Sequence, residues 1–323
     1  PARLCHRPTA GRGRGALTAG RVQRVRIRGR GKGSFGLPVA SVSEIHRYPV
    51  KSMLGERLGE IPVGTNGLRG DRAWAVRDEK RESIEGARKL PGLLACRARF
   101  AEPVPETGEL PVPEIELPDG ARMRADDPRA AERLSALLGR PVTLWPPVPA
   151  EDTEHYKRAR IESASMDAEL RATFARLPDE PLPDLGAFPR EVLLSSTLPG
   201  TYFDAYPLLL LTRTSLASLA AATPDSRFDP RRFRPNLLLD ADAAEGFPEN
   251  DWVGRRVRVG EVVFRVAMAC PRCLMTTLPF ADLPKDPSVM RTLVKENGGN
   301  AGVYASVEQP GVVREGDAVE LLG

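Results

Sequence analysis

The stretch Val257-Arg-Val-Gly-Glu-Val-Val-Phe-Arg-Val266 decides the class of fold. Apolar β-branched and aromatic residues lie on both sides of Gly260-Glu261, so the stretch predicts a strand, a tight turn and a second strand. Short strands joined by glycine turns are typical of a β-barrel or a β-sandwich. We therefore expect a mainly β protein around this hairpin.

The neighbouring segments extend the pattern. Residues 312–322 predict two further strand-like pieces, and residues 237–240 predict a short buried strand. The apolar run 207–212 precedes a predicted helix over residues 215–222, which Thr214 could cap. Because no βαβ spacing repeats along the chain, the sequence argues against a doubly wound nucleotide-binding fold.

The first half of the chain gives weaker strand signals and one clear helix. Residues 39–45 and 72–77 have strand-like patterns. The helix is predicted over Pro128–Leu138, because Asp127 can cap it, proline suits the first helical position and Gly139 ends it.

Residues 151–190 differ in character from both halves. They begin as a polar, charged stretch and then carry apolar residues at helical spacing between Met166 and Leu177. Prolines at positions 178, 181, 183 and 189 break any regular structure in the remainder of the segment. We interpret this segment as a connection between two domains or as an insertion.

The composition agrees with a β-rich protein of two domains. A chain of 323 residues holds about two domains at roughly 100–200 residues each. Its 31 Pro and 29 Gly residues argue against a helical bundle and for many turns. The sequence has no run of the ~18 apolar residues that a membrane-spanning helix needs. Four Cys make no disulfide framework, so a cytoplasmic location is expected.

The positive charge of the chain is concentrated at its start. Residues 1–40 hold nine Arg, one Lys and no acidic residue, whereas the other 283 residues hold 37 basic and 43 acidic residues. Residues 1–38 therefore predict a disordered basic tail before a mildly acidic folded part. Such a tail could bind nucleic acid or a membrane surface, but its low complexity alone explains it, and we expect no nucleic acid partner.

The segment Met268-Ala-Cys-Pro-Arg-Cys273 carries the strongest chemical motif. Cys270 and Cys273 could form half of a zinc site, a redox-active dithiol, or a site in which one thiolate beside Arg272 binds a redox metal. The remaining cysteines and the histidines are scattered, which disfavours zinc, and the βαβ context of a thioredoxin-like dithiol is missing. Two buried structural cysteines are the plain alternative.

Several basic residues could bind an anion. Arg232 and Arg234 flank Phe233, and both Lys51-Ser52 and Arg72 lie in predicted loops. Arginine offers a planar, two-pronged donor to phosphate, so a phosphate-bearing cofactor could use several of these groups at once. The sequence has no GxxxxGK[ST] run and no convincing GxGxxG motif, and its three His support no Ser-His-Asp site.

Five blocks of sequence occur in an order that resembles one family. They are Tyr48-Pro-Val-Lys-Ser52, Gly67-Leu-Arg-Gly-Asp-Arg72, Asp204-Ala-Tyr-Pro-Leu-Leu-Leu-Leu-Thr-Arg-Thr-Ser-Leu216, Arg232-Phe-Arg-Pro-Asn236 and Met268-Ala-Cys-Pro-Arg-Cys-Leu-Met-Thr-Thr277. Together they are similar to the MOSC family with its N-terminal β-barrel domain, and within it to the mitochondrial amidoxime-reducing components and their bacterial counterparts. The resemblance covers residues 39–323, with a poor match over 151–190.

The resemblance implies a mainly β fold with some α-helix. A MOSC N-terminal β-barrel-like domain at residues 39–150 would pack against a MOSC β-barrel domain at residues 191–323, with 151–190 as a linker or insertion. It also implies a molybdenum cofactor at their junction, in which a pterin dithiolene holds the metal and a phosphate must be bound.

The activity implied by the resemblance is the reduction of N-hydroxylated or other N-oxygenated compounds, with the oxygen removed as water. Because no Cys follows Cys273, we expect no iron–sulfur cluster in this chain. Electrons would then come from a separate donor protein, of ferredoxin or reductase type.

The site residues of the family match positions in this sequence. Cys273 would be both the molybdenum ligand and the catalytic residue. Pro271 stands where relatives often have a polar residue, and Tyr206 replaces a smaller one. The positions implied to bind the cofactor, which include the anion candidates found above, are Lys51, Ser52, Arg72, Asp204, Ala205, Tyr206, Arg234, Asn236, Pro271 and Arg272.

A second class of function stays open. A non-catalytic cofactor carrier, or a module that transfers sulfur or cofactor, could use the same domain, since MOSC domains also form the C-terminal part of molybdenum-cofactor sulfurases. The pyridoxal-phosphate desulfurase domain of those proteins is much larger than anything here. This chain alone is therefore not expected to mobilise sulfur from cysteine.

Overall fold

The structure is a computed structural model that describes residues 38–161 and 163–323. The basic tail predicted over residues 1–38 lies outside the described residues, apart from Pro38. Within the described ranges, no helix is long and apolar enough to cross a membrane.

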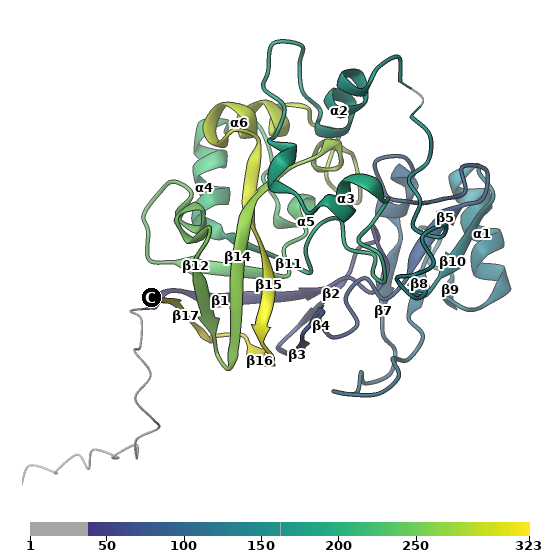
Figure 1. Cartoon of the computed structure of the whole chain (residues 1–323), viewed down its shortest axis with the longest axis horizontal. Coiled ribbons are helices and arrows are strands. Elements are labelled where there is room, and N and C mark those ends of the chain that lie inside the picture. The colour runs from purple at the N-terminus through teal and green to yellow at the C-terminus, as the bar shows by residue number, and fades with distance from the viewer. Residues whose placement is uncertain (1–37, 162) are drawn as a thin grey trace, which may run out of the picture. The chain divides into compact units, whose positions relative to one another are not determined.

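A closed β-barrel forms the centre of the described chain (Figure 1). Seven of the described strands follow one another in the order β12-β11-β15-β14-β13-β17-β1, and the pairing of β1 with β12 closes the ring. The mainly β, barrel-containing fold predicted from the sequence is confirmed. The strands are β1 (Pro38–Arg47), β11 (Leu208–Thr212), β12 (Leu237–Ala241), β13 (Arg256–Val259), β14 (Val262–Pro271), β15 (Asn300–Gln309) and β17 (Ala318–Leu322).

The hairpin predicted from the sequence is the β13–β14 pair. Val259 pairs with Val262 across the turn, and Gly260 has a φ of 56° that favours glycine. Side chains of a strand alternate between its two faces, so Val262, Phe264 and Val266 of β14 all point into the barrel core. Strand β14 therefore carries Cys270 in the barrel wall, and Cys273 follows just after the strand ends.

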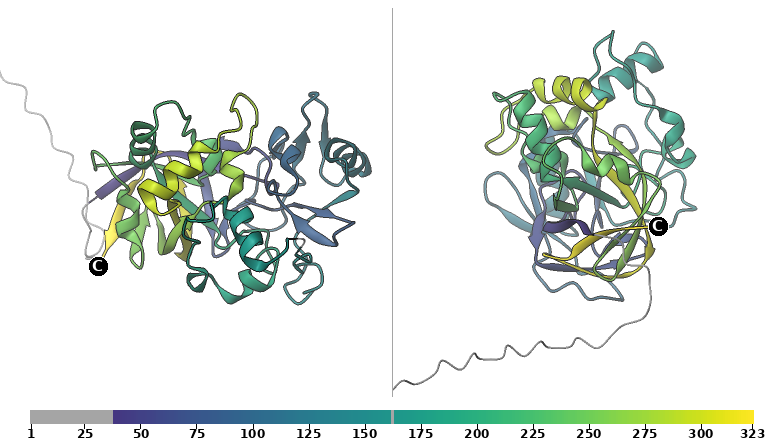
Figure 2. Two further views of the ribbon diagram at one scale, coloured as in Figure 1. Left: turned by 90° about the horizontal axis from the view of Figure 1, so that it is seen from above. Right: turned by 90° about the vertical axis from the view of Figure 1, so that its left-hand side faces the viewer.

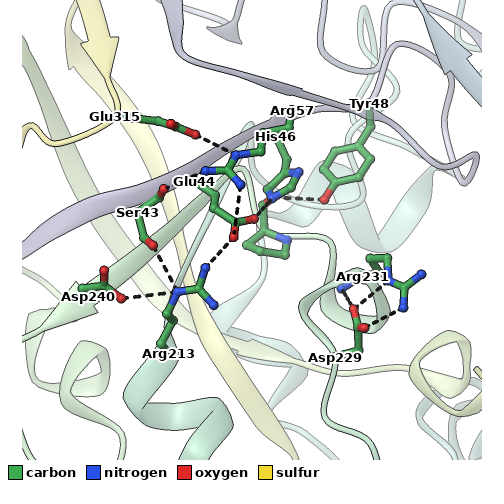
Figure 3. Close-up of polar contacts among 11 residues, drawn as sticks. Ser43, Glu44, His46, Tyr48, Arg57, Arg213, Asp229, Arg231, Asp240 and Glu315 are labelled. Atoms are coloured by element: carbon green, nitrogen blue, oxygen red, sulfur yellow. Dashed lines mark hydrogen bonds and ion pairs between the residues drawn. The ribbon is translucent and has the colours of Figure 1, made fainter.

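Strand β1 brings the start of the described chain into the barrel. It pairs with β12 on one side and with β17 on the other, and Figure 2 shows the purple β1 beside the yellow C-terminal strand. On its outer side, Glu44 lies between Arg57, Arg213 and His46 (Figure 3). Burial raises the pKa of the Glu44 carboxyl, but these neighbours outweigh that effect and lower it. The network fastens β1 to the first residue of helix α4.

Two three-stranded sheets, β10-β5-β6 and β7-β8-β9, pack with helix α1 (Pro128–Leu138) around a second hydrophobic core, which includes Leu93, Ile115 and Leu134. Strand β2 extends the barrel sheet beside β1, and the sheet β16-β3-β4 packs against the barrel core. The predicted bounds of α1 are confirmed, since Asp127 accepts the Arg129 amide hydrogen and Gly139 ends the helix in a left-handed conformation. The strands are β2 (Glu56–Leu58), β3 (Glu60–Gly64), β4 (Gly67–Leu68), β5 (Ala75–Asp78), β6 (Ser83–Glu85), β7 (Arg97–Arg99), β8 (Glu114–Glu116), β9 (Arg122–Arg124), β10 (Val142–Trp145) and β16 (Gly311–Arg314).

Two strands from the first half of the chain pair with strands from the second half. Strand β1 belongs by sequence to the predicted N-terminal domain but closes the barrel, and β3 pairs with β16 near the C-terminus. The boundaries predicted at residues 150 and 191 stay predictions.

Helix α4 starts two residues earlier than the sequence predicted. The prediction of Thr214 as its cap is wrong, because the Thr212 side chain accepts the Ser215 amide hydrogen while the Thr214 hydroxyl donates to the Ala243 carbonyl. Thr212 ends β11 in an extended conformation, which suits a capping residue. The other helices are α2 (Met166–Phe174), α3 (Arg190–Leu194), α4 (Arg213–Ala222), α5 (Pro230–Phe233), α6 (Ser288–Asn297) and the 3-10 segments η1 (Pro91–Ala95), η2 (Leu185–Ala187), η3 (Pro248–Trp252) and η4 (Leu274–Thr277).

The segment 151–190 contacts both halves of the chain. Glu169 of α2 binds Arg88 at 3.0 Å, and Glu180 pairs with Arg291 of α6. This arrangement agrees with the interpretation of the segment as a connection or insertion.

Candidate functional site

Two of the basic residues selected from the sequence, Arg72 and Arg234, lie against one tyrosine, whereas Arg232 donates to main-chain carbonyls elsewhere. The Arg234 guanidinium lies 4.1 Å from the centroid of the Tyr48 ring, and that of Arg72 lies 4.6 Å from it. The Tyr48 hydroxyl donates to the Pro235 carbonyl at 3.1 Å. Burial raises the pKa of Tyr48 to about 12, although both arginines oppose that rise. We call Lys51, Ser52, Arg72 and Arg234 the anion side of the site.

Arg234 carries a buried charge that the described protein does not fully satisfy. Its side chain is 5% exposed, and its Nη1 donates to the Met53 carbonyl. Its Nη2 has no hydrogen-bond partner among the described residues. Burial, and then the charge of Arg72, lower the pKa of Arg234 to about 10. Because an unpaired buried charge is costly, this position suits an anionic ligand.

Arg72 differs from Arg234 in having a counter-ion. It forms an ion pair with the buried Asp71 carboxylate. Burial lowers the pKa of Arg72, but Asp71 more than compensates and raises it. Two cations therefore face one carboxylate at this point, which leaves a net positive charge for a ligand.

Lys51 extends the anion side toward solvent. Its Nζ donates to the Tyr202 carbonyl at 3.0 Å and forms an ion pair with Asp204. Partial desolvation raises the pKa of the Asp204 carboxyl, but Lys51, Arg72 and Arg234 lower it to about 2. Since the Asp204 side chain is 74% exposed, its low pKa comes from these cations. Asp204 is thus the described partner of Lys51, and the predicted contact of Asp204 with a cofactor stays a prediction.

Three residues of the anion side have left-handed backbone conformations. Ser52, Arg72 and Arg234 have φ values of 68°, 48° and 57°, and they are three of the six such non-glycine residues in the described ranges. Left-handed backbone is unfavourable for residues with a Cβ atom and gathers at binding sites. The Ser52 hydroxyl accepts the Ala87 amide hydrogen at 2.9 Å, which fixes this loop against its neighbour.

The second half of the site lies where β14 ends beside β15. We call Cys270, Arg272, Cys273 and Tyr304 the thiol side. Arg272 Nη1 lies 2.8 Å from the Cys270 sulfur, and Arg272 Nη2 donates to the Phe233 carbonyl at 2.7 Å. Burial raises the pKa of the Cys270 thiol, although Arg272 and Tyr304 oppose that rise.

The contact of Arg272 with Cys270 forms at the end of β14. Arg272 follows the last residue of the strand, and its backbone amide donates to the Gly299 carbonyl at 2.9 Å while its side chain reaches Cys270. The sequence led us to expect that Arg272 favours the thiolate of Cys273. Cys273 is among the groups that raise the pKa of Arg272 against the effect of burial, after Cys270 and Tyr304. The effect of Arg272 on Cys273 itself stays a prediction.

Cys273 is the most accessible described cysteine. It is half-buried, whereas Cys96 and Cys270 are buried, and all three are free thiols. Its carbonyl accepts from the Thr276 amide at 3.2 Å and from the Thr276 hydroxyl at 3.1 Å. The thiol of Cys273 is therefore attached to a fixed backbone and is available to a metal.

The other predicted cofactor contacts surround these two sides. Ala205 is buried, the Tyr206 ring lies tilted against Tyr304 with ring centroids 5.6 Å apart, and Pro271 pairs with Asn300 of β15. Tyr206 and Tyr304 thus form an aromatic wall next to Cys270. None of these contacts involves a ligand, so the predicted roles stay predictions.

Asn236 is engaged by the protein itself. Its Nδ2 donates to Asp71 Oδ2 at 3.0 Å and to the His46 carbonyl at 3.3 Å, and its Oδ1 accepts the Leu209 amide hydrogen at 3.1 Å. Asn236 therefore positions Asp71, the partner of Arg72.

Sequence reasoning missed three residues of the site. Tyr48 and Asp71 stand inside quoted sequence blocks, and their place there was the available signal. Tyr304 lies in a segment without a motif, and only its register opposite Met268 brings it to the thiol side.

The two sides together fit a ligand with a phosphate and a soft metal. Two buried guanidinium nitrogens, Arg234 Nη2 and Arg272 Nε, lack hydrogen-bond partners among the described residues. Arginine donors match phosphate oxygens, and a thiolate is a soft ligand for a transition metal.

Two family models match the chain. The model of the MOSC N-terminal beta barrel domain matches residues 39–127, and the model of the MOSC domain matches residues 198–320. Lys51, Ser52 and Arg72 lie in the first range, and Arg234 and Cys273 lie in the second.

Curated relatives match across nearly the same span. The chain is 27% identical to mitochondrial amidoxime-reducing component 1 of Xenopus laevis, over 87% of this chain and 82% of the relative. It is 26% identical to the Homo sapiens protein of that name, over 88% of this chain and 84% of the relative. It is also 26% identical to molybdenum cofactor sulfurase of Oryza sativa subsp. japonica, over 74% of this chain and 29% of the relative. The chain is therefore a member of the MOSC family and joins a MOSC N-terminal beta barrel domain to a MOSC domain.

Proposed function

We propose that this protein is a molybdenum-cofactor-dependent oxidoreductase that reduces N-hydroxylated or other N-oxygenated compounds with electrons from a separate donor protein. The similarity to amidoxime-reducing components over most of the chain supports the reaction class. The cytoplasmic location expected from the sequence stays a prediction.

The observation that carries the proposal is the unsatisfied Arg234 of the anion side, together with the accessible Cys273 thiol of the thiol side. Arg234 Nη2 is buried without a partner among the described residues, and Arg72 adds a second cation against the same Tyr48 ring. A phosphate bound by these donors would compensate the buried charge. The Cys273 sulfur would bind the metal of the same cofactor.

The residues of the chain have separate tasks in this proposal. When bound, a molybdenum cofactor supplies a metal that takes up electrons singly and delivers two of them to a substrate. Arg234, Arg72 and Lys51 hold and orient the phosphate end, and Cys273 fixes the metal end. Arg272 holds the Cys270 thiol against the wall with Tyr304. Removal of one oxygen as water consumes two electrons and two protons.

The test combines metal analysis with a reduction assay. The purified protein should contain about one molybdenum and one pterin per chain, and it should convert benzamidoxime to benzamidine with reduced methyl viologen as an artificial donor. A protein that binds no molybdenum when expressed in a cofactor-producing host would contradict the proposal. Full cofactor loading without reduction of any N-oxygenated compound would contradict the reaction class alone.

A carrier or transfer module is the second candidate, and the match to molybdenum cofactor sulfurase favours it. The chain spans under a third of that relative, so sulfur mobilisation is not carried over. A carrier would release its cofactor to an apo-enzyme within one incubation. An oxidoreductase would keep it through many turnovers.

A further inference from the structure

Arg232 and Arg234 lie two residues apart but have opposite surroundings. Arg232 is 1% exposed, and its hydrogen bonds within the described ranges all go to main-chain carbonyl groups. It donates to the carbonyls of Arg227 at 3.1 Å, Thr276 at 3.0 Å, Leu278 at 3.1 Å and Pro284 at 2.7 Å.

The burial of this charge is costly for the fold. Burial lowers the pKa of Arg232, while Asp286 and Asp229 oppose that effect from a distance. No ion pair of Arg232 is present in the described ranges, so the groups in direct contact with its charge are main-chain carbonyls. An apolar side chain would fill the same volume without the free-energy cost of burying a charge. The hydrogen bonds that Arg232 donates are therefore what distinguishes it from an apolar residue at this position.

Those bonds converge on the segment just after Cys273. Thr276 belongs to η4, and Leu278 is the residue that ends η4. Thr276 in turn donates from its amide and its hydroxyl to the Cys273 carbonyl. A continuous set of hydrogen bonds therefore runs from the Arg232 guanidinium through Thr276 to the backbone of Cys273.

We propose that Arg232 is a positioning residue that fixes the direction of the Cys273 thiol. One guanidinium holds Thr276 of η4, the capping residue Leu278 and Pro284, and Thr276 in turn holds the Cys273 carbonyl through two hydrogen bonds. A metal ligand needs such a fixed direction, because loss of supporting hydrogen bonds typically costs metal affinity about ten- to a hundredfold. This inference rests on the proposed role of Cys273 as the metal ligand.

The first experiment uses the cofactor-free protein. The rate of alkylation of Cys273 by iodoacetamide is measured by peptide mass spectrometry for wild type, Arg232→Met and Arg232→Lys. We expect about tenfold faster labelling in Arg232→Met, because η4 opens more often. Arg232→Lys should recover part of the protection, since an ammonium keeps the charge but lacks the planar fork.

The matched control is Arg231→Met on the same helix. Arg231 is 39% exposed and pairs with Asp229 and Asp282, so its loss should leave Cys273 labelling unchanged. A second control, Leu219→Ala, removes a fully buried side chain of α4 and lowers the thermal midpoint by general destabilisation. If Leu219→Ala and Arg232→Met lower the thermal midpoint equally and also raise the Cys273 labelling rate equally, Arg232 is a purely structural arginine and the inference is wrong.

The second experiment uses the loaded protein. Arg232→Met should keep pterin within about twofold of wild type, while molybdenum content falls about tenfold or the Mo(V) electron paramagnetic resonance signal broadens. Unchanged metal content with an unchanged signal overturns the inference. If wild type itself binds no molybdenum, the proposed function fails, and the labelling rates still decide whether Arg232 holds Cys273.

Discussion

The two sides of the candidate site are built in different ways. The anion side comes from loops, and three of its four residues have left-handed backbone. The thiol side comes from the paired strands β14 and β15 and the short η4 segment, in which backbone hydrogen bonds fix each position. The anion side leaves Arg234 Nη2 without a partner among the described residues, whereas the thiol side holds Cys273 just after the end of β14 by hydrogen bonds to its carbonyl.

We therefore expect the anion side to bind the phosphate and the thiol side to bind the metal. A phosphate needs several donors from different directions, which loops can supply, and a metal needs one ligand in a fixed direction, which a sheet can supply. Loss of the Cys273 ligand on the thiol side should therefore remove the chemistry, and changes on the anion side should weaken binding.

The largest effect is expected from Cys273→Ser. Serine is nearly isosteric but a poor soft ligand, so reductase activity should fall to background while circular dichroism and most of the pterin persist. Cys270→Ser should cost some stability and little activity. Equal loss of activity in both variants, with a Cys270–Cys273 disulfide that forms and is reduced during turnover, would show that the site is a redox-active dithiol and not a metal site.

A smaller effect is expected on the anion side, from Arg234→Ala. The variant removes a charge-assisted contact worth about 1.5–3 kcal/mol, so cofactor affinity should fall about ten- to a hundredfold. Arg234→Lys should recover only part of it. The measurement is the pterin-to-protein ratio after dialysis, with the exposed Arg231→Ala as control. Full retention in both Arg234 variants would show that the anion side does not bind the phosphate.

The backbone of the anion side can be tested at Ser52. Ser52→Ala loses the bond to Ala87 and keeps an unfavourable φ, whereas Ser52→Gly loses the bond and relieves the backbone. Ser52→Gly should therefore be about 1 kcal/mol more stable than Ser52→Ala in urea unfolding. At the helical control Ser135 in α1, alanine should be the more stable variant by about the same amount. If the alanine variant were the more stable one at Ser52 as well as at Ser135, the backbone of Ser52 would not be strained.

The smallest effect concerns the pH dependence of the Lys51–Asp204 pair. The pKa of Asp204 is about 2 in the folded protein and about 3.9 in the unfolded chain, so the carboxylate stabilises the fold above pH 4. This contribution is lost as the pH falls toward 2. The thermal midpoint of Asp204→Asn should lie below wild type at pH 5, and the gap should close at lower pH. A constant gap would show that the pair does not stabilise the fold.

Local sequence signals predicted much of the fold. The cap and stop residues gave the bounds of α1, and the glycine turn gave the β13–β14 hairpin, because both depend on neighbours in sequence. Barrel closure by β1 and the place of Tyr304 were not predicted, because both depend on strand pairings between distant segments. The predicted anion candidates do gather, but their sequence contexts gave no indication that Arg232 and Arg234 differ.

The closure of the barrel by β1 also affects how the chain folds. Pro38 pairs with Glu320, so the pairing of β1 with β17 joins segments at opposite ends of the described chain. Contacts of such separation form slowly, because the intervening loop must lose its entropy first. Until then β12 and β17 present open edges that could pair with other chains. On the ribosome, β1 must wait until β17 (Ala318–Leu322) has been made before both its neighbours exist, and its exposed edges make this stage vulnerable to aggregation.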